Sequence, residues 1–346
     1  MDQKRIIDEF KELVSIEVHS RDERSIADVL KEKLTALGLT VTEDKAGEVL
    51  GGNTGNLYAQ LPGSTDGEPV LFSAHMDRVG NHGHIVPLVK EEGKIVSDGT
   101  SILAGDDIGG VAAILAMLRE VKEKQIPHGP IEVAFSVCEE TGVEGSRQYD
   151  FSKFRSKSAF VYDASGKAGT IVLAAPSKGR VTIRVHGVTA HAGNEPEKGL
   201  NALKVAADLI MQLPDGRLSP VSTANFSIIE AGSATNVVCD LVTITGEQRS
   251  RDAKEYQQIS ADIQAAADRI SEKYHTKIEV ELHTLYHAFK LEETARPCVL
   301  AKEAAEAACA VPFFKEGGGG MDANHFNEHG IAPFRHPERR ESSYVR

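Results

Sequence analysis

The sequence has only four cysteines, no excess of basic charge and no long apolar run, and each shortage excludes a class of protein. The cysteines form no CxxC pair and lie far apart, at Cys138, Cys239, Cys298 and Cys309. Reduced thiols in a cytoplasm are the simplest account of that spacing. The formal net charge is −12, and no basic stripe stands out that would bind a nucleic acid. No apolar run is long enough to cross a bilayer, so we expect neither a nucleic acid nor a membrane as a partner.

The 346 residues are enough for two domains with cores of their own. Apolar residues recur at helical spacing in two stretches of residues 4–37, and again from Ile108 onward, which predicts helices there. Short apolar runs predict buried strands at residues 57–61, 69–74, 131–137 and 159–162. Because strands and helices alternate, we expect an α/β sandwich in this part of the chain.

The pattern changes near Pro176. From there it predicts strands and helices in the order βαββαβ, at residues 180–186, 200–213, 224–230, 241–247, 252–274 and 277–283. That order is the ferredoxin-like arrangement. The chain then returns to a helix at residues 297–308. We therefore expect a discontinuous domain of residues 1–176 and 286–346, with a lid-like α+β domain of residues 177–285 inserted in it.

Four short motifs each put an acid or a histidine just past a predicted strand. They are Ala74-His75-Met76-Asp77, Ala104-Gly105-Asp106-Asp107, Cys138-Glu139-Glu140-Thr141 and Val161-Tyr162-Asp163. Each alone has a simpler interpretation as a solvated strand end, a helix cap or a charged turn. Together they gather carboxylates and one imidazole where open α/β sheets place their sites, and these groups suit a pair of divalent metal ions. A metal-assisted hydrolase is therefore the leading interpretation.

The spacing within two of these motifs predicts a division of roles. His75 and Asp77 are two residues apart on a strand and share a face, so the carboxylate can hold the ring nitrogen that does not bind metal. Glu139 and Glu140 are adjacent, and in an extended chain they point to opposite sides. One can then bind a metal ion while the other acts as general base on a metal-activated water.

Two further motifs lie in the inserted domain. His191 follows a strand in the loop Gly187-Val188-Thr189-Ala190-His191-Ala192-Gly193, and Arg249 lies at another strand end. Their functional interpretation is oxyanion support from the imidazole and a carboxylate clamp from the guanidinium. From the residues alone, surface-loop positions are an equally good account.

Taken in order, the motifs resemble a known family. The chain is similar to the cocatalytic dizinc exopeptidases that include peptidase T, carboxypeptidase G and the aminoacylases, and within them to the peptidase T-like branch. Besides the strand-end acids, the resemblance covers Ala190-His191-Ala192-Gly193 and Gly319-Gly320-Met321-Asp322-Ala323-Asn324. It implies a zinc-exopeptidase sandwich, a mixed sheet flanked by helices, with an inserted ferredoxin-like lid. It also implies a cytoplasmic aminopeptidase that cleaves short peptides, as a tripeptidase does, and forms a homodimer through the lid.

The resemblance implies a metal-ligand set. His75, Asp106 and Asp163 would bind one ion, and Asp106 and Glu140 the second, so that Asp106 bridges the two. The expected ions are two zinc ions, with cobalt or manganese as alternatives. In relatives the peptide bond after the bridging aspartate is cis.

The resemblance also implies roles around the metal ions. Asp77 would orient His75, Glu139 would be the general base, and His191 would reach the tetrahedral intermediate. The residues expected to contact the substrate or line its pocket are Arg249, Asn236, Gly319 and Asn324.

The tail departs from the family pattern. The family supplies the last ligand of its second metal ion as a histidine in a Val/Ile-His-Thr motif, and Arg335–Tyr344 contains no such motif. The residues Ser342–Val345 can be encoded so that a one-base shift reads Val-His-Thr. The hypothesis that follows is a frameshifted tail after Pro333, with the lost ligand near Ser343. The second metal site is then incomplete unless another histidine substitutes, the candidates being His325, His329 and His336.

Two alternatives to the aminopeptidase stay open. The first is an amidohydrolase that removes an acyl group from an N-acyl amino acid, and a panel of tripeptides against N-acyl amino acids would separate it. The second is a catalytically crippled protein that binds peptide, which the altered tail favours. Metal analysis would separate this one, because two ions per chain support the enzyme.

Overall fold

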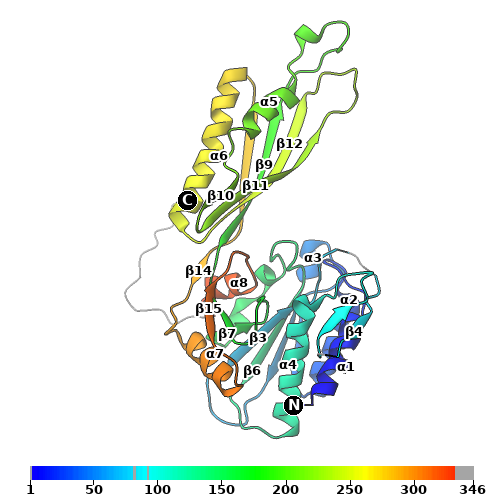
Figure 1. Ribbon diagram of the computed structural model, residues 1–346, viewed down its shortest axis with the longest axis vertical. Helices are drawn as coiled ribbons and strands as arrows, with labels where there is room; N and C mark the ends of the chain where they lie inside the picture. The colour runs from blue at the N-terminus through cyan, green and yellow to red at the C-terminus, as the bar shows by residue number, and fades with distance from the viewer. Residues whose placement is uncertain (1, 81–82, 92, 332–346) are drawn as a thin grey trace. The chain divides into compact units, whose positions relative to one another are not determined.

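The computed structural model describes residues 2–80, 83–91 and 93–331. Within these residues the chain forms two compact units. Unit 1 comprises the residues up to Leu173, Leu291–Glu316 and the residues from Met321, and unit 2 comprises Ala174–Lys290 and Gly317–Gly320. Each unit contains a five-stranded sheet with helices packed against it (Figure 1).

The sheet of unit 1 is mixed. Its strand order is β1 (Thr40–Glu43), β2 (Leu57–Leu61), β6 (Ile131–Ser136), β3 (Val70–His75) and β7 (Ser158–Val161). Strand β3 runs parallel to both of its neighbours, whereas β1, β2 and β6 pair antiparallel in sequence. Because β6, β3 and β7 are parallel, their carboxyl ends meet at one edge of the sheet, where three of the predicted motifs begin.

Both faces of this sheet are covered. On one face Val133 and Phe135 of β6 pack against buried residues of three helices, α1 (Gln3–Val14), α2 (Arg24–Ala36) and α4 (Gly105–Glu123). On the other face Leu71 and Ala134 pack with Tyr149 and with Phe326 of α8 (Ala323–Glu328). Alternate residues of a strand point to opposite faces, so the continuous apolar run of β6 serves both cores.

The other elements of unit 1 are short or lie at its periphery. They include α3 (Ala46–Leu50), the hairpin of β4 (Pro87–Val89) and β5 (Ile95–Ser97), α7 (Arg296–Ala307) and β15 (Phe313–Glu316). Strand β8 (Thr170–Ala175) begins in unit 1 and ends in unit 2. Short 3-10 turns lie at Ser146–Gln148, Phe151–Lys153 and, in unit 2, Pro196–Lys198. The residues of unit 1 that flank the inserted unit are in contact, because the backbone N–H of Leu291 donates to the carbonyl of Leu173 over 2.7 Å.

Unit 2 is an antiparallel sheet covered on one face by two helices. The strand order is β10 (Gly216–Ser219), β11 (Ser222–Ala231), β12 (Leu241–Ser250), β9 (Ser177–His186) and β13 (Ile278–Tyr286). Alternate residues of β9 are fully buried against α5 (Ala202–Ile210) and α6 (Ala253–Tyr274). The short strand β14 (Phe289–Lys290) lies outside this sheet and pairs antiparallel with β8, at Ala174 and Ala175.

The predicted fold class is confirmed. Strands β11, β12, β9 and β13 have the order of a ferredoxin-like βαββαβ sheet, with β10 added at its edge. Regular helical geometry in α4 starts at Ile108, as the periodicity predicts, because Asp106 and Asp107 have non-helical backbone angles. The strands β1 and β10 were not predicted. Each has four residues, of which none is buried, so neither gives the apolar signal of a strand.

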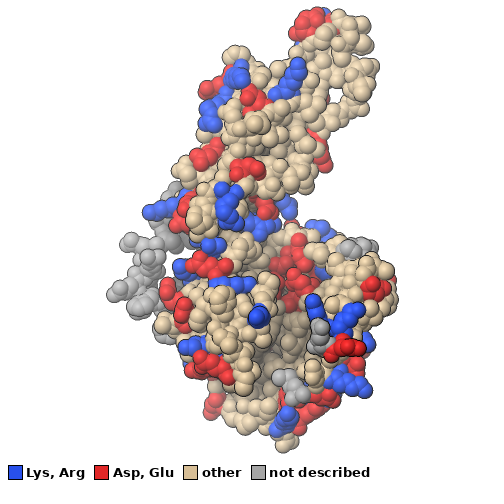
Figure 2. All heavy atoms as spheres, viewed as in Figure 1, with Lys and Arg blue, Asp and Glu red and all other residues tan. Residues whose placement is uncertain are grey.

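The surface gives two findings that bear on partners. Among the described residues, no helix combines the length and the apolar character that a membrane span requires. On the visible face, acidic and basic side chains are interspersed (Figure 2), without a continuous basic band among the described residues shown there.

Candidate metal centre

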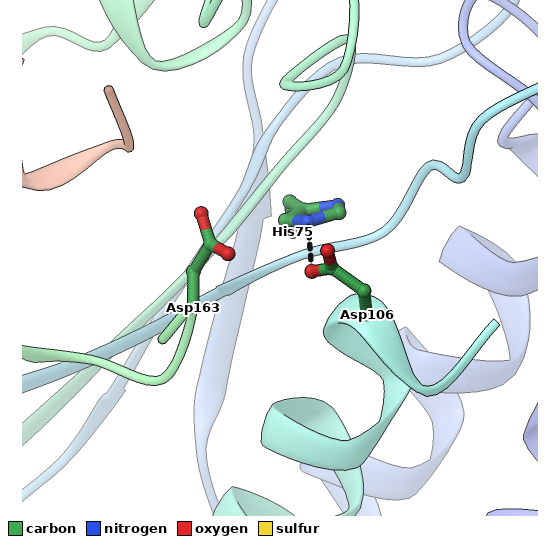
Figure 3. Close-up of side chains that lie close together, drawn as sticks. All are labelled: His75, Asp106 and Asp163. Carbon is green, nitrogen blue, oxygen red and sulfur yellow. Dashed lines mark hydrogen bonds and ion pairs between the residues drawn. The ribbon is translucent and has the colours of Figure 1, made fainter. Parts of the chain in front are cut away.

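Three of the four predicted ligands come together at the carboxyl edge of the unit 1 sheet. His75 is the last residue of β3, Asp163 follows β7, and Asp106 lies in the first turn of α4. One ligand atom of each lies within 4.8 Å of the others, and the three side chains point toward one another (Figure 3). His75 Nε2 and Asp106 Oδ1 are 3.3 Å apart. One imidazole nitrogen and two carboxylates are a donor set that fits a divalent metal ion.

The His75 ring is held from behind by Asp77. His75 Nδ1 lies 3.2 Å from Asp77 Oδ1 and 3.0 Å from the Asp77 carbonyl oxygen, which leaves Nε2 to face the acids. Burial would raise the pKa of Asp77, but the hydrogen bond and the charge of His75 lower it. Ser20 Oγ donates to Asp77 Oδ2 over 2.6 Å, so the carboxylate is itself fixed. This is the arrangement that orients a metal-binding imidazole.

The acids of this site are crowded around a single imidazole, that of His75. Burial raises the pKa of Asp163 to about 8; His75 opposes the rise, while Asp106 and Asp322 add to it. The pKa of Asp106 is lowered, first by its hydrogen bond with His75. A cation bound between carboxylates reduces the repulsion between them, and this edge of the sheet is partly exposed. The residues present therefore fit the metal site that the donor set indicates.

Asp107 is not part of this cluster. Its side chain is buried, and its Oδ2 accepts a hydrogen bond of 3.2 Å from the backbone N–H of His75. The peptide bond between Asp106 and Asp107 is cis, as the resemblance implies. A Cβ at Gly110 would lie 2.4 Å from Asp107 Oδ1 and 2.7 Å from Tyr162 Cβ, so only glycine allows α4 to approach so closely.

Glu139 and Glu140 follow β6 and differ in their surroundings. Glu139 is buried, with 8% of its surface exposed, whereas Glu140 is partly exposed. Burial raises the pKa of Glu139 to about 9; His75 opposes the rise, and Asp322 and Asp163 add to it. Burial also raises the pKa of Glu140. Glu140 is not part of the three-residue cluster, although its backbone N–H donates to Asp77 Oδ2.

Asp322 belongs to the Gly319–Asn324 motif, and the sequence alone does not predict a role for it. It is buried at the start of α8, where Ser136 Oγ donates to its Oδ2, and its charge raises the pKa of both Glu139 and Asp163. Asn324, the predicted substrate contact in this motif, is also buried, and its Oδ1 accepts from Met321 N over 3.0 Å. The only sign of this role in the sequence is that the motif contains an acidic residue.

Two of the histidines that could replace the missing metal ligand, His325 and His329, already make other contacts. His325 is buried, with its Nε2 3.1 Å from the carbonyl oxygen of Val143. The His329 ring stacks on Phe151, with 3.7 Å between ring centroids. His336 and the rest of the tail after Pro333, including Ser343, lie outside the described residues.

The predicted site residues of unit 2 form two groups. His191 is exposed, and its Nδ1 accepts from the backbone N–H groups of Gly193 and Asn194, each over 3.2 Å. Its loop lies beside Asn236, whose carbonyl accepts from Ala192 N over 3.0 Å.

Arg249 and the glycine-rich turn form the second group. Arg249 Nε donates to Glu247 over 2.6 Å, and its Nη1 lies 3.5 Å from the Gly318 carbonyl oxygen. In the same turn Gly319 has open space where a side chain would be, whereas Gly320 abuts the ring of Tyr286.

Comparison with known proteins identifies two matching families. Residues 176–275 match the peptidase dimerisation domain of the M20 family, and residues 56–193 match peptidase family M28. The chain is 36% identical over 331 residues to the uncharacterized protein YqjE of Bacillus subtilis, which covers 96% of this chain and 89% of that protein.

Solved structures agree with these matches. Aminopeptidase PepT from Bacillus cereus is 39% identical with a TM-score of 0.85, over 96% of this chain and 89% of that one. A tripeptidase from Staphylococcus aureus is 33% identical with a TM-score of 0.89, over 96% and 88%. A dinuclear metal-binding peptidase of the M20 family from Bacillus subtilis shares the fold at 16% identity, with a TM-score of 0.69 over 94% and 86%.

Proposed function

The chain belongs to the peptidase T-like branch of the M20 metallopeptidases, and on that premise we propose that it is an aminopeptidase acting on short peptides. The observation that carries this proposal is the convergence of His75, Asp106 and Asp163 within 4.8 Å at the sheet edge. Two solved relatives at more than 30% identity are an aminopeptidase and a tripeptidase, which favours tripeptides as substrates.

We propose two zinc ions as the cofactor, with cobalt or manganese as alternatives. His75, Asp106 and Asp163 would hold the first ion, and Asp106 and Glu140 would hold the second. When bound, such ions polarise the substrate carbonyl and lower the pKa of water. Asp106 would help to hold both ions, and its side chain, which is 70% exposed, is accessible for that role.

Glu139 is the proposed general base. It would take a proton from the attacking water and pass it to the leaving amine. Its burial excludes bulk water, and the same burial raises its pKa to about 9. Positive charge beside it would bring that pKa down toward the operating pH, where a base exchanges protons most effectively.

Unit 2 is proposed to contribute to substrate binding and dimerisation. The match of residues 176–275 to a dimerisation domain supports a homodimer through this unit. His191 would support the developing oxyanion, and Arg249, with Asn236, would contact the substrate. The residues proposed to line the substrate pocket are Gly319 and Asn324. Domain boundaries at 1–176 with 286–346, and at 177–285, remain our proposal.

We also propose a cytoplasmic location. The four cysteines are free thiols, with Cys138, Cys239 and Cys298 buried and Cys309 exposed. Free thiols are the usual state in a reducing compartment.

The decisive experiment combines a substrate panel with one substitution. We expect the zinc-loaded enzyme to cleave tripeptides and to leave N-acyl amino acids intact; the reverse preference would favour the amidohydrolase. Glu139→Gln should lower kcat by about 10²- to 10⁴-fold while zinc remains bound. Turnover near the wild-type rate in that variant would refute Glu139 as the base. A metal content of one ion or none in the purified wild-type protein would favour the crippled form.

A further inference from the structure

Four consecutive backbone N–H groups after β6 donate to buried side chains rather than to backbone or solvent. The donors and acceptors are Val137 N to Asn56 Oδ1 (2.9 Å), Cys138 N to Glu23 Oε1 (3.0 Å), Glu139 N to Asp77 Oδ1 (3.0 Å) and Glu140 N to Asp77 Oδ2 (3.2 Å). The acceptors Asn56, Glu23 and Asp77 are all fully buried. Residues 137–140 include the proposed base and a proposed ligand. Each backbone amide of this segment is therefore held by a side chain from another part of the chain.

The backbone of Cys138 determines where this segment goes. Its φ is 51°, in the left-handed region that a residue with a side chain rarely adopts. Such a conformation persists only where the surroundings impose it, and it is commonest at functional sites. Because Glu139 and Glu140 follow directly, a change of the Cys138 backbone would redirect both carboxylates.

Glu23 is the group that holds Cys138. Its Oε1 accepts from the backbone N–H of Cys138 and of Arg21, each over 3.0 Å, and lies 3.5 Å from Cys138 Sγ. Glu23 occupies the N-cap position of α2, yet its side chain makes no capping hydrogen bond there. The sequence position suggests a helix cap, but the carboxylate serves the loop after β6 instead.

Burial of the Glu23 carboxylate lowers the stability of the folded protein. The side chain is 0% exposed, and its Oε2 has no hydrogen-bond partner among the described residues. A buried acid with one unpaired oxygen destabilises a fold relative to an apolar side chain of similar size. A functional role in the adjacent segment of Glu139 and Glu140 would explain why an acid is found at this position.

We propose that Glu23 is a positioning residue: it holds Cys138 in the left-handed conformation and thereby aims Glu139 and Glu140. Asp77 completes the arrangement by binding the next two amides, and Ser20, three residues before Glu23, fixes Asp77 in turn. The inference rests on the proposed roles of Glu139 and Glu140.

The test compares three substitutions of Glu23. Glu23→Ala removes the acceptor, Glu23→Asp withdraws it by one methylene, and Glu23→Gln keeps an amide oxygen in its place. We expect kcat on a tripeptide to fall on the order of 10- to 100-fold in Glu23→Ala, and less in Glu23→Asp, with little change in KM. Glu23→Gln should recover most of the rate. If Glu23→Ala does not fold, Glu23→Asp and Glu23→Gln carry the comparison.

A second readout is independent of activity. Hydrogen–deuterium exchange of the peptide covering residues 137–141, measured in metal-free protein, should speed up in Glu23→Ala and Glu23→Asp but not in Glu23→Gln. Unchanged exchange would overturn the proposal whatever the rates are. If Glu139→Gln retains turnover, the proposed function fails instead, and the exchange data still report whether Glu23 holds the segment.

Glu132 provides a matched control, because it lies in β6 at the end opposite to residues 137–140. It is 2% exposed against 0% for Glu23, and it accepts from Tyr58 Oη over 2.7 Å and from Ser156 N over 2.9 Å. Glu132→Ala should lower the thermal midpoint comparably while kcat of the folded enzyme stays within about twofold. Equal losses of kcat in the two alanine variants would show a merely structural role for Glu23 and overturn the proposal.

Discussion

Replacing Asp77 by asparagine tests the hydrogen-bond network around the metal site, because this carboxylate has four polar neighbours and no spare oxygen. His75 Nδ1 and Glu139 N face Oδ1, and Ser20 Oγ and Glu140 N face Oδ2. Asparagine has one acceptor oxygen and one NH₂ group. Whichever way the amide turns, its NH₂ group must face a backbone N–H that needs an acceptor.

The magnitude follows from that mismatch. One buried backbone N–H left without an acceptor costs about 1–3 kcal/mol. Loss of the carboxylate behind a metal-binding histidine typically weakens metal binding by about 10- to 100-fold, which corresponds to about 1.4–2.8 kcal/mol. We therefore expect Asp77→Asn to bind zinc about 10- to 100-fold more weakly and, when metal-free, to be about 1–3 kcal/mol less stable.

Zinc affinity is measured by competition with a chromophoric chelator, and metal-free stability by chemical denaturation. The matched control is Ser20→Ala, which removes one donor to Asp77 and leaves the carboxylate in place. It should weaken zinc binding by less than about threefold, since only one neutral hydrogen bond is lost. Wild-type zinc affinity in Asp77→Asn would refute the assigned role of this carboxylate.

Three further predictions address metal, pH and packing. Chelation should lower the thermal midpoint, because the crowded acids around Asp163 lose their counter-charge, and zinc at about 1,000 times its Kd should restore about 4 kcal/mol; an unchanged midpoint would contradict a metal site. Burial works to raise the pKa of Glu43, but hydrogen bonds, above all from Arg24, lower it below its usual value. Glu43 therefore stabilises the fold above about pH 4.5. The difference of about 1–2 kcal/mol between wild type and Glu43→Gln should shrink as the pH falls from 7 to 3 in denaturation experiments, and a difference independent of pH would contradict this account. Gly320→Ala would place a Cβ 2.1 Å from the Tyr286 ring and should lower the stability by about 1–3 kcal/mol, whereas the same change in the preceding glycine meets open space and should cost under about 0.5 kcal/mol.

The sequence predicted those parts of the site that are written in local patterns. His75, Asp106 and Asp163 each stand in a short motif next to a strand or helix with a strong apolar signal, so their meeting at one sheet edge follows from the parallel strands. The family and the fold class, inferred from the order of these motifs, are confirmed. Glu140 as a ligand and Glu139 as the base stay predictions.

The parts that Glu23 and Asp322 play at the site could not be predicted, because they depend on contacts between segments that are distant in the sequence. Glu23 precedes an ordinary amphipathic helix, and nothing near it in the sequence indicates that it reaches Cys138, 115 residues away. Asp322 meets Ser136 across 186 residues in the same way. The frameshift hypothesis and the missing histidine concern residues outside the described part, and gene sequencing tests them directly.

The hydrogen bond between Leu173 and Leu291 has a consequence for how this architecture tolerates change. An insertion whose two ends emerge side by side adds little loop-closure entropy to the host, whatever its length. The host can therefore exchange the intervening segment for a shorter turn or for another module without losing its own strand pairing. Exchange at this junction would replace His191 and Arg249, which we propose to act on the substrate, and would leave His75, Asp106 and Asp163 in place. A single scaffold could in this way diversify in specificity.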